Sequence, residues 1–270
     1  MLGYHTPPML PNRENEDLNR AFFFTFCDEP KMLRHCVPIF ILPTGNPFVT
    51  DIYANGTAGL IDTGTRKLLV TCEHIWAEFL RFRKDNPTAR LAVVCKEGPG
   101  FPVLIDDKSL IDCDSELDLA VFDANPFIDQ LGPKAHFSVY QFPVVDPKAK
   151  DPISFIGFPG QFRHSAEGVA RFRYSSFWLS VADVSDTRII LTNADRRHMY
   201  DNDRNLVLPH DLGGMSGAPV FTRTSSWGFK LAGFVRAGNS SDRSIFLSKA
   251  SFLRRDGSLF RPNWHRHPTP

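Results

Sequence analysis

Short apolar runs, broken at close intervals by proline and glycine, constrain this chain more than any other feature of its sequence. Its 270 residues include 21 prolines, 18 glycines and 24 phenylalanines. Proline and glycine mark turns, whereas phenylalanine favours strands, where aromatic side chains pair with their neighbours. Long stretches of helical periodicity are scarce. The pattern therefore predicts an all-β protein built from many short strands.

The bulk composition is that of a soluble globular protein and excludes several partner classes. Charged residues make up 23% of the chain and its net charge is +1, which gives no electrostatic reason to expect nucleic acid or a membrane as partner. No apolar run approaches the roughly 20 residues that span a bilayer. Residues 1–20 lack the charged-then-apolar pattern of a signal peptide.

The cysteines indicate a reducing compartment. They are odd in number and contain no C-x-x-C pair, which excludes a complete disulfide framework and the usual metal spacing. The five are Cys27, Cys36, Cys72, Cys95 and Cys113. We therefore expect a cytoplasmic protein that uses no metal.

Residues 212–220, LGGMSGAPV, are the strongest candidate for chemistry. A serine hydroxyl is a weak nucleophile, so a catalytic serine such as Ser216 needs an exposed tight turn beside a general base. Gly214 would let backbone N–H groups turn inward, and those of Gly214 and Ser216 would form an oxyanion hole. An ordinary Gly/Ser/Pro turn between two strands is the alternative for this stretch taken alone.

Two further stretches supply partners for this serine. Residues 56–71 read as a hairpin around a Thr-Gly-Thr turn, and His74 follows the end of its second strand, on a short helical turn from Glu73 to about Leu80. Histidine suits a general base because its ordinary pKa lies near neutral pH. Asp118 opens the apolar run DLAV, where a carboxylate can be buried and orient an imidazole.

The three local patterns resemble the signatures of trypsin-like serine proteases of the chymotrypsin fold (PA clan). They are Gly-x-Ser-Gly-x-Pro around Ser216, Val-Thr-x-x-His ending at His74, and Asp-Leu-Ala-Val beginning at Asp118, in the family's order of His, Asp and Ser. The resemblance covers about residues 50–250 and is greatest to the intracellular, bacterial-type branch, which lacks disulfides and zymogen activation. It implies two six-stranded antiparallel β-barrels with the active site in the cleft between them.

The resemblance also implies a domain organisation. We expect an N-terminal leader or arm at 1–45, an N-terminal barrel with His74 and Asp118 at 46–142, a C-terminal barrel with Ser216 at 143–255, and a tail at 256–270. The prolines of residues 142–152 make this stretch the best candidate for the linker. Residues 37–43 form a short apolar run whose prolines favour the edge of a sheet.

The resemblance implies a serine endopeptidase that hydrolyses peptide bonds through an acyl-enzyme. Ser216 would be the nucleophile, His74 the general base and Asp118 the orienting carboxylate, acting on a polypeptide with no cofactor. In zymogen-activated relatives an aspartate precedes the nucleophile, whereas this chain has Met215. What orders the oxyanion loop is therefore open; an activating protein partner, an oligomer and the leader are the candidates.

Three residues match the substrate pocket of this family. His210 matches its floor, and Arg236 and Gly238 match its wall. A basic pocket would favour an acidic side chain at the cleaved position. The alternative is that Asp211 neutralises His210 and that Arg236 points away, towards Asp118 or solvent.

Two other functions fit parts of the sequence. Gly-Met-Ser-Gly-Ala at 214–218 roughly fits the nucleophile elbow of α/β-hydrolases, but that fold requires its acid and histidine after the serine, and alternating strands and helices. The second alternative is a catalytically silent trypsin-like pseudoprotease that binds peptides or proteins. Serine-directed labelling distinguishes a silent binder from an enzyme.

Overall fold

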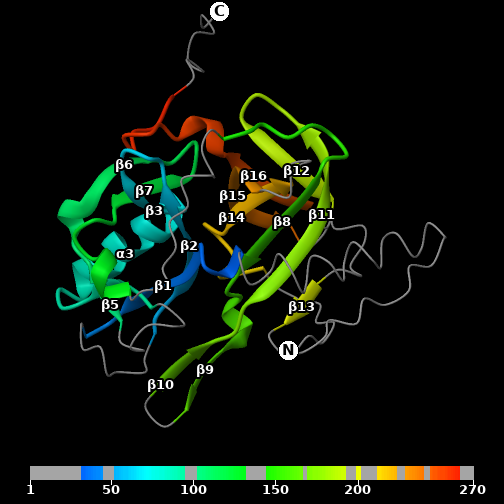
Figure 1. Ribbon diagram of the computed structural model, residues 1–270. Helices are drawn as coiled ribbons and strands as arrows, with labels where there is room; N and C mark the ends of the chain where they lie inside the picture. Colours follow the sequence, from blue (N-terminus) through cyan, green and yellow to red (C-terminus); the bar gives the residue numbers. More distant parts are fainter. Residues whose placement is uncertain are drawn as a thin grey trace, which may run out of the picture.

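Two antiparallel β-sheets, packed side by side, make up most of the protein (Figure 1). The structure is a computed structural model that describes nine segments of the chain. These are residues 32–44, 52–94, 102–131, 144–166, 169–192, 199–201, 212–223, 229–239 and 244–261. Among these residues, no helix is long and apolar enough to span a membrane.

The first sheet has seven strands in the order β5-β4-β1-β2-β3-β7-β6. The strands are β1 (Cys36–Leu42), β2 (Asn55–Asp62), β3 (Lys67–Thr71), β4 (Arg90–Val93), β5 (Val103–Ile105), β6 (Leu110–Asp114) and β7 (Leu119–Asp123). Its end strands, β5 and β6, do not pair with each other within the described residues. The sheet is curled but, unlike the predicted six-stranded barrel, is not closed by hydrogen bonds.

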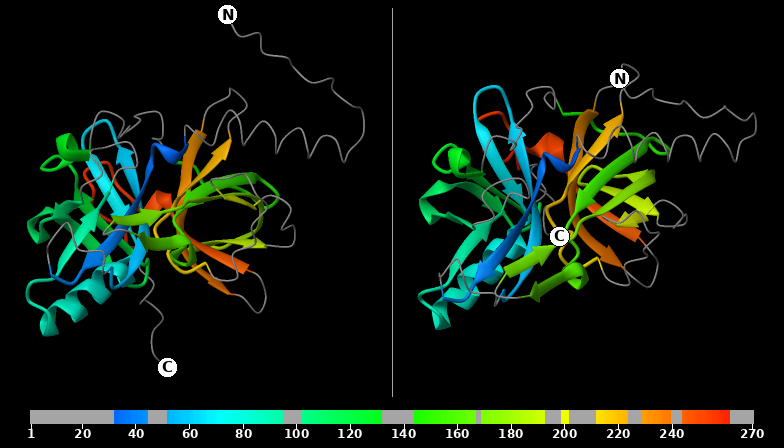
Figure 2. Two further views of the ribbon diagram at one scale, coloured as in Figure 1. Left: turned by 90° about the horizontal axis from the view of Figure 1, so that it is seen from below. Right: turned by 60° about the horizontal axis from the view of Figure 1, so that its bottom comes forward.

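The second sheet closes into a barrel. Its strands are β8 (Pro152–Gly157), β11 (Ser175–Val184), β12 (Arg188–Thr192), β13 (Met199–Asp201), β14 (Pro219–Arg223), β15 (Phe229–Asn239) and β16 (Ser244–Lys249). Their order is β12-β16-β15-β14-β8-β11-β13, and β11 also pairs with β12, which completes a ring of six strands. The left view of Figure 2 shows this ring beside the first sheet. A separate hairpin, β9 (Arg163–Ala166) and β10 (Val169–Phe172), projects from the barrel.

The predicted all-β, trypsin-like architecture is therefore confirmed, with one closed six-stranded barrel and a curled seven-stranded sheet in place of the second predicted barrel. The hairpin predicted at 56–71 is β2 paired with β3, and Gly64 has the positive φ (83°) that its turn requires. The helix after it, α3 (Glu73–Asp85), is longer than the short turn we expected. Ile75, Trp76 and Phe79 give it a buried face that continues beyond the first turn.

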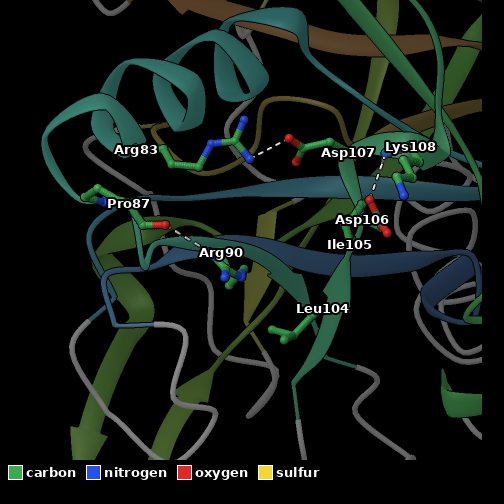
Figure 3. A pocket seen from close by; sticks show the side chains of 8 residues that line it. All are labelled: Arg83, Pro87, Arg90, Leu104, Ile105, Asp106, Asp107 and Lys108. Atoms are coloured by element: carbon green, nitrogen blue, oxygen red, sulfur yellow. Dashed lines mark hydrogen bonds and ion pairs between the residues drawn. The ribbon is translucent and has the colours of Figure 1, made fainter.

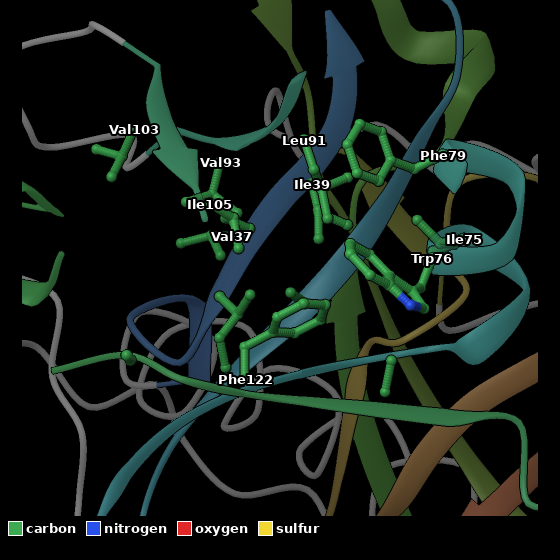
Figure 4. Close-up of a cluster of buried hydrophobic side chains, with 14 of the residues drawn as sticks. Val37, Ile39, Ile75, Trp76, Phe79, Leu91, Val93, Val103, Ile105 and Phe122 are labelled. Carbon is green, nitrogen blue, oxygen red and sulfur yellow. The ribbon is translucent and has the colours of Figure 1, made fainter. Parts of the chain in front are cut away.

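The core of the first sheet is aromatic where α3 packs on it. Trp76 lies edge-on to Phe122 of β7, with ring centroids 5.4 Å apart, and Phe79 lies 5.3 Å from Trp76 (Figure 4). A second cluster joins the two sheets, since Ile61 of β2 and Phe234 of β15 belong to the same set of buried side chains. This shared core fixes how the sheets face one another.

Strand β1 corrects two expectations. We expect residues 37–43 at the edge of a sheet and within the leader at 1–45, yet β1 pairs with β2 on one side and β4 on the other. Pro38 is tolerated because it faces only Thr57 of β2, and pairing with β4 begins at Ile39. The missing N–H of this proline therefore costs no hydrogen bond between strands.

The C-terminal segment corrects a third expectation. Residues 256–261 were assigned to a tail, but this part of the chain returns to the first sheet after the 3-10 turn Ala250–Phe252 (Figure 1). Leu259 is buried, and its backbone N–H donates to the Asp112 carboxylate of β6 at 2.9 Å. Arg261 forms ion pairs with Asp112 at 2.6 Å and Asp114 at 2.8 Å. The segment is thus part of the folded body.

Candidate active site

Strand pairing brings the predicted histidine and aspartate together. Strand β3 runs antiparallel to β7, with Thr71 opposite Ala120, so the residues that follow β3 and those that precede β7 meet at one edge of the first sheet. His74 lies in the first turn of α3, and Asp118 directly precedes β7.

The His74 ring and the Asp118 carboxylate form a close hydrogen-bonded pair. Nδ1 of His74 lies 3.0 Å from both carboxylate oxygens, and the backbone N–H of His74 donates to Oδ1 at 3.0 Å. Because a carboxylate only accepts, the Nδ1 atom carries the proton and Nε2 of the neutral ring is left free to act as a base. The His74 side chain is 52% exposed, whereas that of Asp118 is 9% exposed.

The environment keeps Asp118 ionised. Burial raises the pKa of this carboxyl group, but the hydrogen bonds from His74 and the positive charges of His74 and Arg236 outweigh burial and hold the pKa below its ordinary value. Asp118 also has a positive φ of 52°, which residues other than glycine adopt only where contacts enforce it. A buried, charged and conformationally constrained aspartate is typical of a functional site.

Ser216 lies at the same boundary, on the loop that precedes β14. Its backbone carbonyl accepts a hydrogen bond from Thr57 N–H of β2 at 2.9 Å. The following residue, Gly217, donates to the Val235 carbonyl at 2.7 Å, and the thiol of Cys72, next to α3, donates to that same oxygen at 3.1 Å. The segments that carry Ser216 and His74 therefore meet at Val235.

The Ser216 hydroxyl has its own partner in this structure. It donates to the Arg236 carbonyl at 3.3 Å. Within the described part of the chain, no hydrogen bond joins it directly to His74. The Ser216 hydroxyl and the His74 ring thus lie on segments that meet at Val235, with no direct hydrogen bond between the two side chains.

The predicted oxyanion loop is held in a defined conformation. Gly214 has a φ of +90°, and a Cβ there would lie 2.6 Å from the backbone of Gly160. The Thr57 hydroxyl donates to the Gly214 carbonyl at 2.8 Å, and Gly160 N–H donates to the Gly213 carbonyl at 2.7 Å. The backbone N–H groups of Gly214 and Ser216 donate to no acceptor among the described residues. No described residue therefore competes with an added acceptor for these two N–H groups.

Met215 anchors this loop in the barrel core. Its side chain is fully buried with Val220 and Val235. The Met215 side chain fills the space beside Gly157, where a Cβ would lie 2.7 Å from its Cε. The position of the zymogen-type aspartate is thus occupied by an apolar contact.

The predicted substrate-binding residues have different outcomes. His210 lies outside the described residues. Gly238 is exposed on β15, and a Cβ there would lie 2.4 Å from Leu212. The Arg236 side chain is directed at Asp118, with Nε 3.7 Å from Oδ2, and Nη1 donates to the Glu116 carbonyl at 3.0 Å. The Arg236 side chain therefore lies beside Asp118, one of the alternatives that its sequence position left open.

Cys72 is the residue that sequence reasoning missed at this site. The donor atoms of Cys72, His74 and Asp118 lie within 4.8 Å of one another and are of types that zinc accepts. Burial, followed by the charge of Asp118, raises the pKa of the Cys72 thiol. The Cys72 thiol is therefore protonated and donates to the Val235 carbonyl, whereas a cysteine that binds zinc must be an unprotonated thiolate.

A separate pocket of about 760 Å³ lies between the end of α3 and strands β4 and β5 (Figure 3). Its lining includes Arg83, which pairs with Asp107, and Arg90, whose guanidinium donates to the Pro87 carbonyl at 3.2 Å. The pocket contains none of the residues that surround Asp118. Arg83 and Asp107 neutralise each other here, whereas Arg90 is bonded to backbone carbonyls.

The closed six-stranded barrel, the curled sheet beside it and the site at their boundary define the trypsin-like, chymotrypsin-type fold that the motifs predicted. No protein-family model and no curated protein sequence matches the chain.

Three solved proteases are among the structures to which the chain is similar. The thermostable serine protease AL20 from an extremophilic microorganism is 14% identical with a TM-score of 0.44, over 80% of this chain and 91% of its own. A Glu endopeptidase is 13% identical with a TM-score of 0.45, over 79% and 84% of the two chains. A variant of the tobacco etch virus protease is 9% identical with a TM-score of 0.44, over 82% and 76%. At such identities function must be argued from the site itself.

Proposed function

We propose that this protein is a serine endopeptidase. Ser216 attacks the peptide carbonyl, His74 takes the hydroxyl proton on Nε2 and returns it to the leaving amine, and Asp118 stabilises the imidazolium. The backbone N–H groups of Gly214 and Ser216 stabilise the oxyanion. The observation that carries the proposal is the buried, ionised Asp118 held by both Nδ1 and the backbone N–H of His74.

The substrate is a polypeptide bound in extended form. Pairing between β14 and β15 ends at Phe234, and beyond it Ala237 and Gly238 are exposed next to the Ser216 loop. An extended peptide can add to this edge through backbone hydrogen bonds. The Arg236 carbonyl, which now accepts the Ser216 hydroxyl, becomes available once the serine turns towards His74.

The enzyme needs no activating cleavage. Thr57, Gly160 and the buried Met215 hold the oxyanion loop through contacts within the chain. A partner protein, an oligomer or the leader is then not required to order it. The purified chain should therefore be reactive as made.

Covalent labelling by a fluorophosphonate, read by intact mass, tests the proposal. A serine that is activated by a base reacts with this probe, whereas ordinary surface serines do not. The wild type should gain one adduct, and Ser216→Ala and His74→Ala should gain none. Ser185→Ala, which removes an exposed serine from a turn of the barrel, should label like the wild type. An adduct that persists in Ser216→Ala would refute the assignment.

A catalytically silent peptide-binding module is the second candidate. It is favoured by one observation, the hydrogen bond from Ser216 to the Arg236 carbonyl in place of one to His74. A well-folded wild type that gains no adduct at any pH between about 6 and 9, where a neutral histidine is available, would support the binding module over the enzyme.

A further inference from the structure

We propose that Arg236 is a positioning residue that holds Asp118, and the turn carrying it, in the orientation that His74 requires. The inference rests on the proposed function, because it assigns to this arginine a role in the same site. It also removes Arg236 from substrate recognition, the role its sequence position suggested.

Arg236 on β15 contacts both the turn that carries Asp118 and the loop that carries Ser216. Its guanidinium lies 3.7 Å from the Asp118 carboxylate and donates to the Glu116 carbonyl, while its own carbonyl accepts the Ser216 hydroxyl. Its side chain is only 26% exposed. An arginine can make these two side-chain contacts at once because its donors are fixed in a planar fork.

The turn at 114–118 needs such support. Asp118 adopts a left-handed backbone conformation, which a residue with a Cβ adopts only when surrounding contacts impose it. Within the turn, the Asp114 carboxylate accepts the N–H groups of Glu116 and Leu117, each at 2.9 Å. From the barrel, Arg236 binds the Glu116 carbonyl and the Ser248 hydroxyl binds the Leu117 carbonyl. Two barrel side chains therefore fix the turn that presents Asp118.

Arg236 also balances an acidic environment. The charged groups around the His74–Asp118 pair are Glu73 on α3, Asp114 on the turn and Arg236 on β15, with the neutral Cys72 thiol behind them. The guanidinium places a positive charge beside the Asp118 carboxylate and offsets part of this negative charge.

The test is the pH dependence of fluorophosphonate labelling in Arg236→Gln, Arg236→Lys and Arg83→Gln. In Arg236→Gln the maximal rate should fall roughly 10- to 100-fold, the loss expected for one charge-assisted hydrogen bond. The half-maximal pH should also rise by about 0.5 to 1 unit, the effect of removing one nearby charge. Arg236→Lys keeps the charge and should keep the pH profile while losing part of the rate.

Arg83→Gln is the matched control. It removes an arginine of similar exposure (31%) on α3, which is ion-paired with Asp107 at the separate pocket. It should leave both the rate and the pH profile of the wild type unchanged. An Arg236→Gln variant whose rate and profile match those of Arg83→Gln would overturn the proposal.

A second readout separates this proposal from the assignment of a serine protease. In a Ser216→Ala background, the downfield proton NMR signal of the His74 Nδ1–H···Asp118 hydrogen bond, assigned by its loss in His74→Gln, requires no reactive serine. Arg236→Gln should weaken or shift this signal and Arg83→Gln should not. If the wild type fails to label but the signal depends on Arg236, the protease assignment falls and the positioning role stands. An unchanged signal in a folded Arg236→Gln variant overturns the positioning role.

Discussion

The hydroxyl of Thr57 donates to the carbonyl of Gly214 across the boundary between the two sheets, at 2.8 Å. The same hydroxyl accepts a hydrogen bond from the N–H of Phe158 at 3.0 Å. Thr57 is completely buried, so both bonds are shielded from water. One side chain of the first sheet therefore fixes the carbonyl that lies directly before Met215 in the proposed oxyanion loop.

Replacing Thr57 by valine should loosen that loop. Thr57→Val leaves the Gly214 carbonyl and the Phe158 N–H unpaired, and each unpaired buried group costs about 1–3 kcal/mol. We expect a lower free energy of unfolding in urea and labelling at least about tenfold slower. Thr57→Ser retains the hydroxyl and should keep most of the labelling rate. Equal labelling of the valine and serine variants would contradict a role for this hydroxyl.

Met215 should tolerate an apolar replacement of its own size and no charged one. Met215→Leu keeps the volume in the barrel core and should cost less than about 1.5 kcal/mol. Met215→Ala leaves a cavity beside Gly157 and should cost about 2–5 kcal/mol. Met215→Asp, the residue of the zymogen-activated relatives, would bury an unpaired charge and should abolish labelling. Thermal unfolding and labelling check the series, and a reactive aspartate variant would disprove the apolar anchor.

Asp118→Asn should separate the effect of the Asp118 charge on labelling from the effect of its backbone conformation. Asparagine tolerates the positive φ of this position, but its amide cannot fix the Nδ1–H tautomer of His74, so labelling should fall roughly 10³- to 10⁴-fold. Far-ultraviolet circular dichroism should match that of the wild type. A labelling rate within about tenfold of the wild type would exclude Asp118 from the mechanism.

The same substitution should change how stability depends on pH. The pKa of Asp118 in the folded protein lies below its ordinary value. A carboxyl of this kind stabilises the fold above its unfolded pKa, and the contribution is lost as the pH falls through the folded pKa. The stability difference between wild type and Asp118→Asn should therefore shrink as the pH falls below about 4, the ordinary value for aspartate. A difference that grows on acidification would contradict this sign.

Arg261 should stabilise the return of the C-terminal segment without affecting chemistry. Arg261→Ala removes the hydrogen-bonded pairs with Asp112 and Asp114 and should lower the free energy of unfolding by roughly 0.5–1.5 kcal/mol, less at high salt. Arg81→Ala breaks an exposed pair with Glu78 within one helix and should cost less than about 0.5 kcal/mol. Both variants should label like the wild type. Equal losses of unfolding free energy in Arg261→Ala and Arg81→Ala would show that the C-terminal segment does not stabilise the fold.

The sequence predicted those parts of the fold that depend on local chemistry. The β2–β3 hairpin followed from its alternating strands and from Gly64, and the strand after Asp118 followed from the apolar run that became β7. In each case the residues that determine the structure are neighbours along the chain. The pairing of β3 with β7 then brought His74 and Asp118 together.

The parts that were missed depend on contacts between distant residues. The residues around Pro38 in the sequence do not show that it is paired with a neighbouring strand on one side only. This one-sided pairing is what allows β1 to lie inside the sheet. The direction of the Arg236 side chain depends on Asp118 and Glu116, more than a hundred residues earlier. Leu259 likewise finds its partner on β6 of the first sheet.

The return of residues 256–261 to the first sheet has a consequence for the order of folding. During synthesis the first sheet emerges long before Leu259 and Arg261, so Asp112 and Asp114 must wait for partners 147 residues further along the chain. The turn that presents Asp118 also waits for Arg236 and Ser248. A nascent chain can form its first sheet early, but it completes the cluster around Asp118 only once the strands that carry Arg236 and Ser248 have been made. The proposed activity would therefore appear only after the second sheet has folded onto the first.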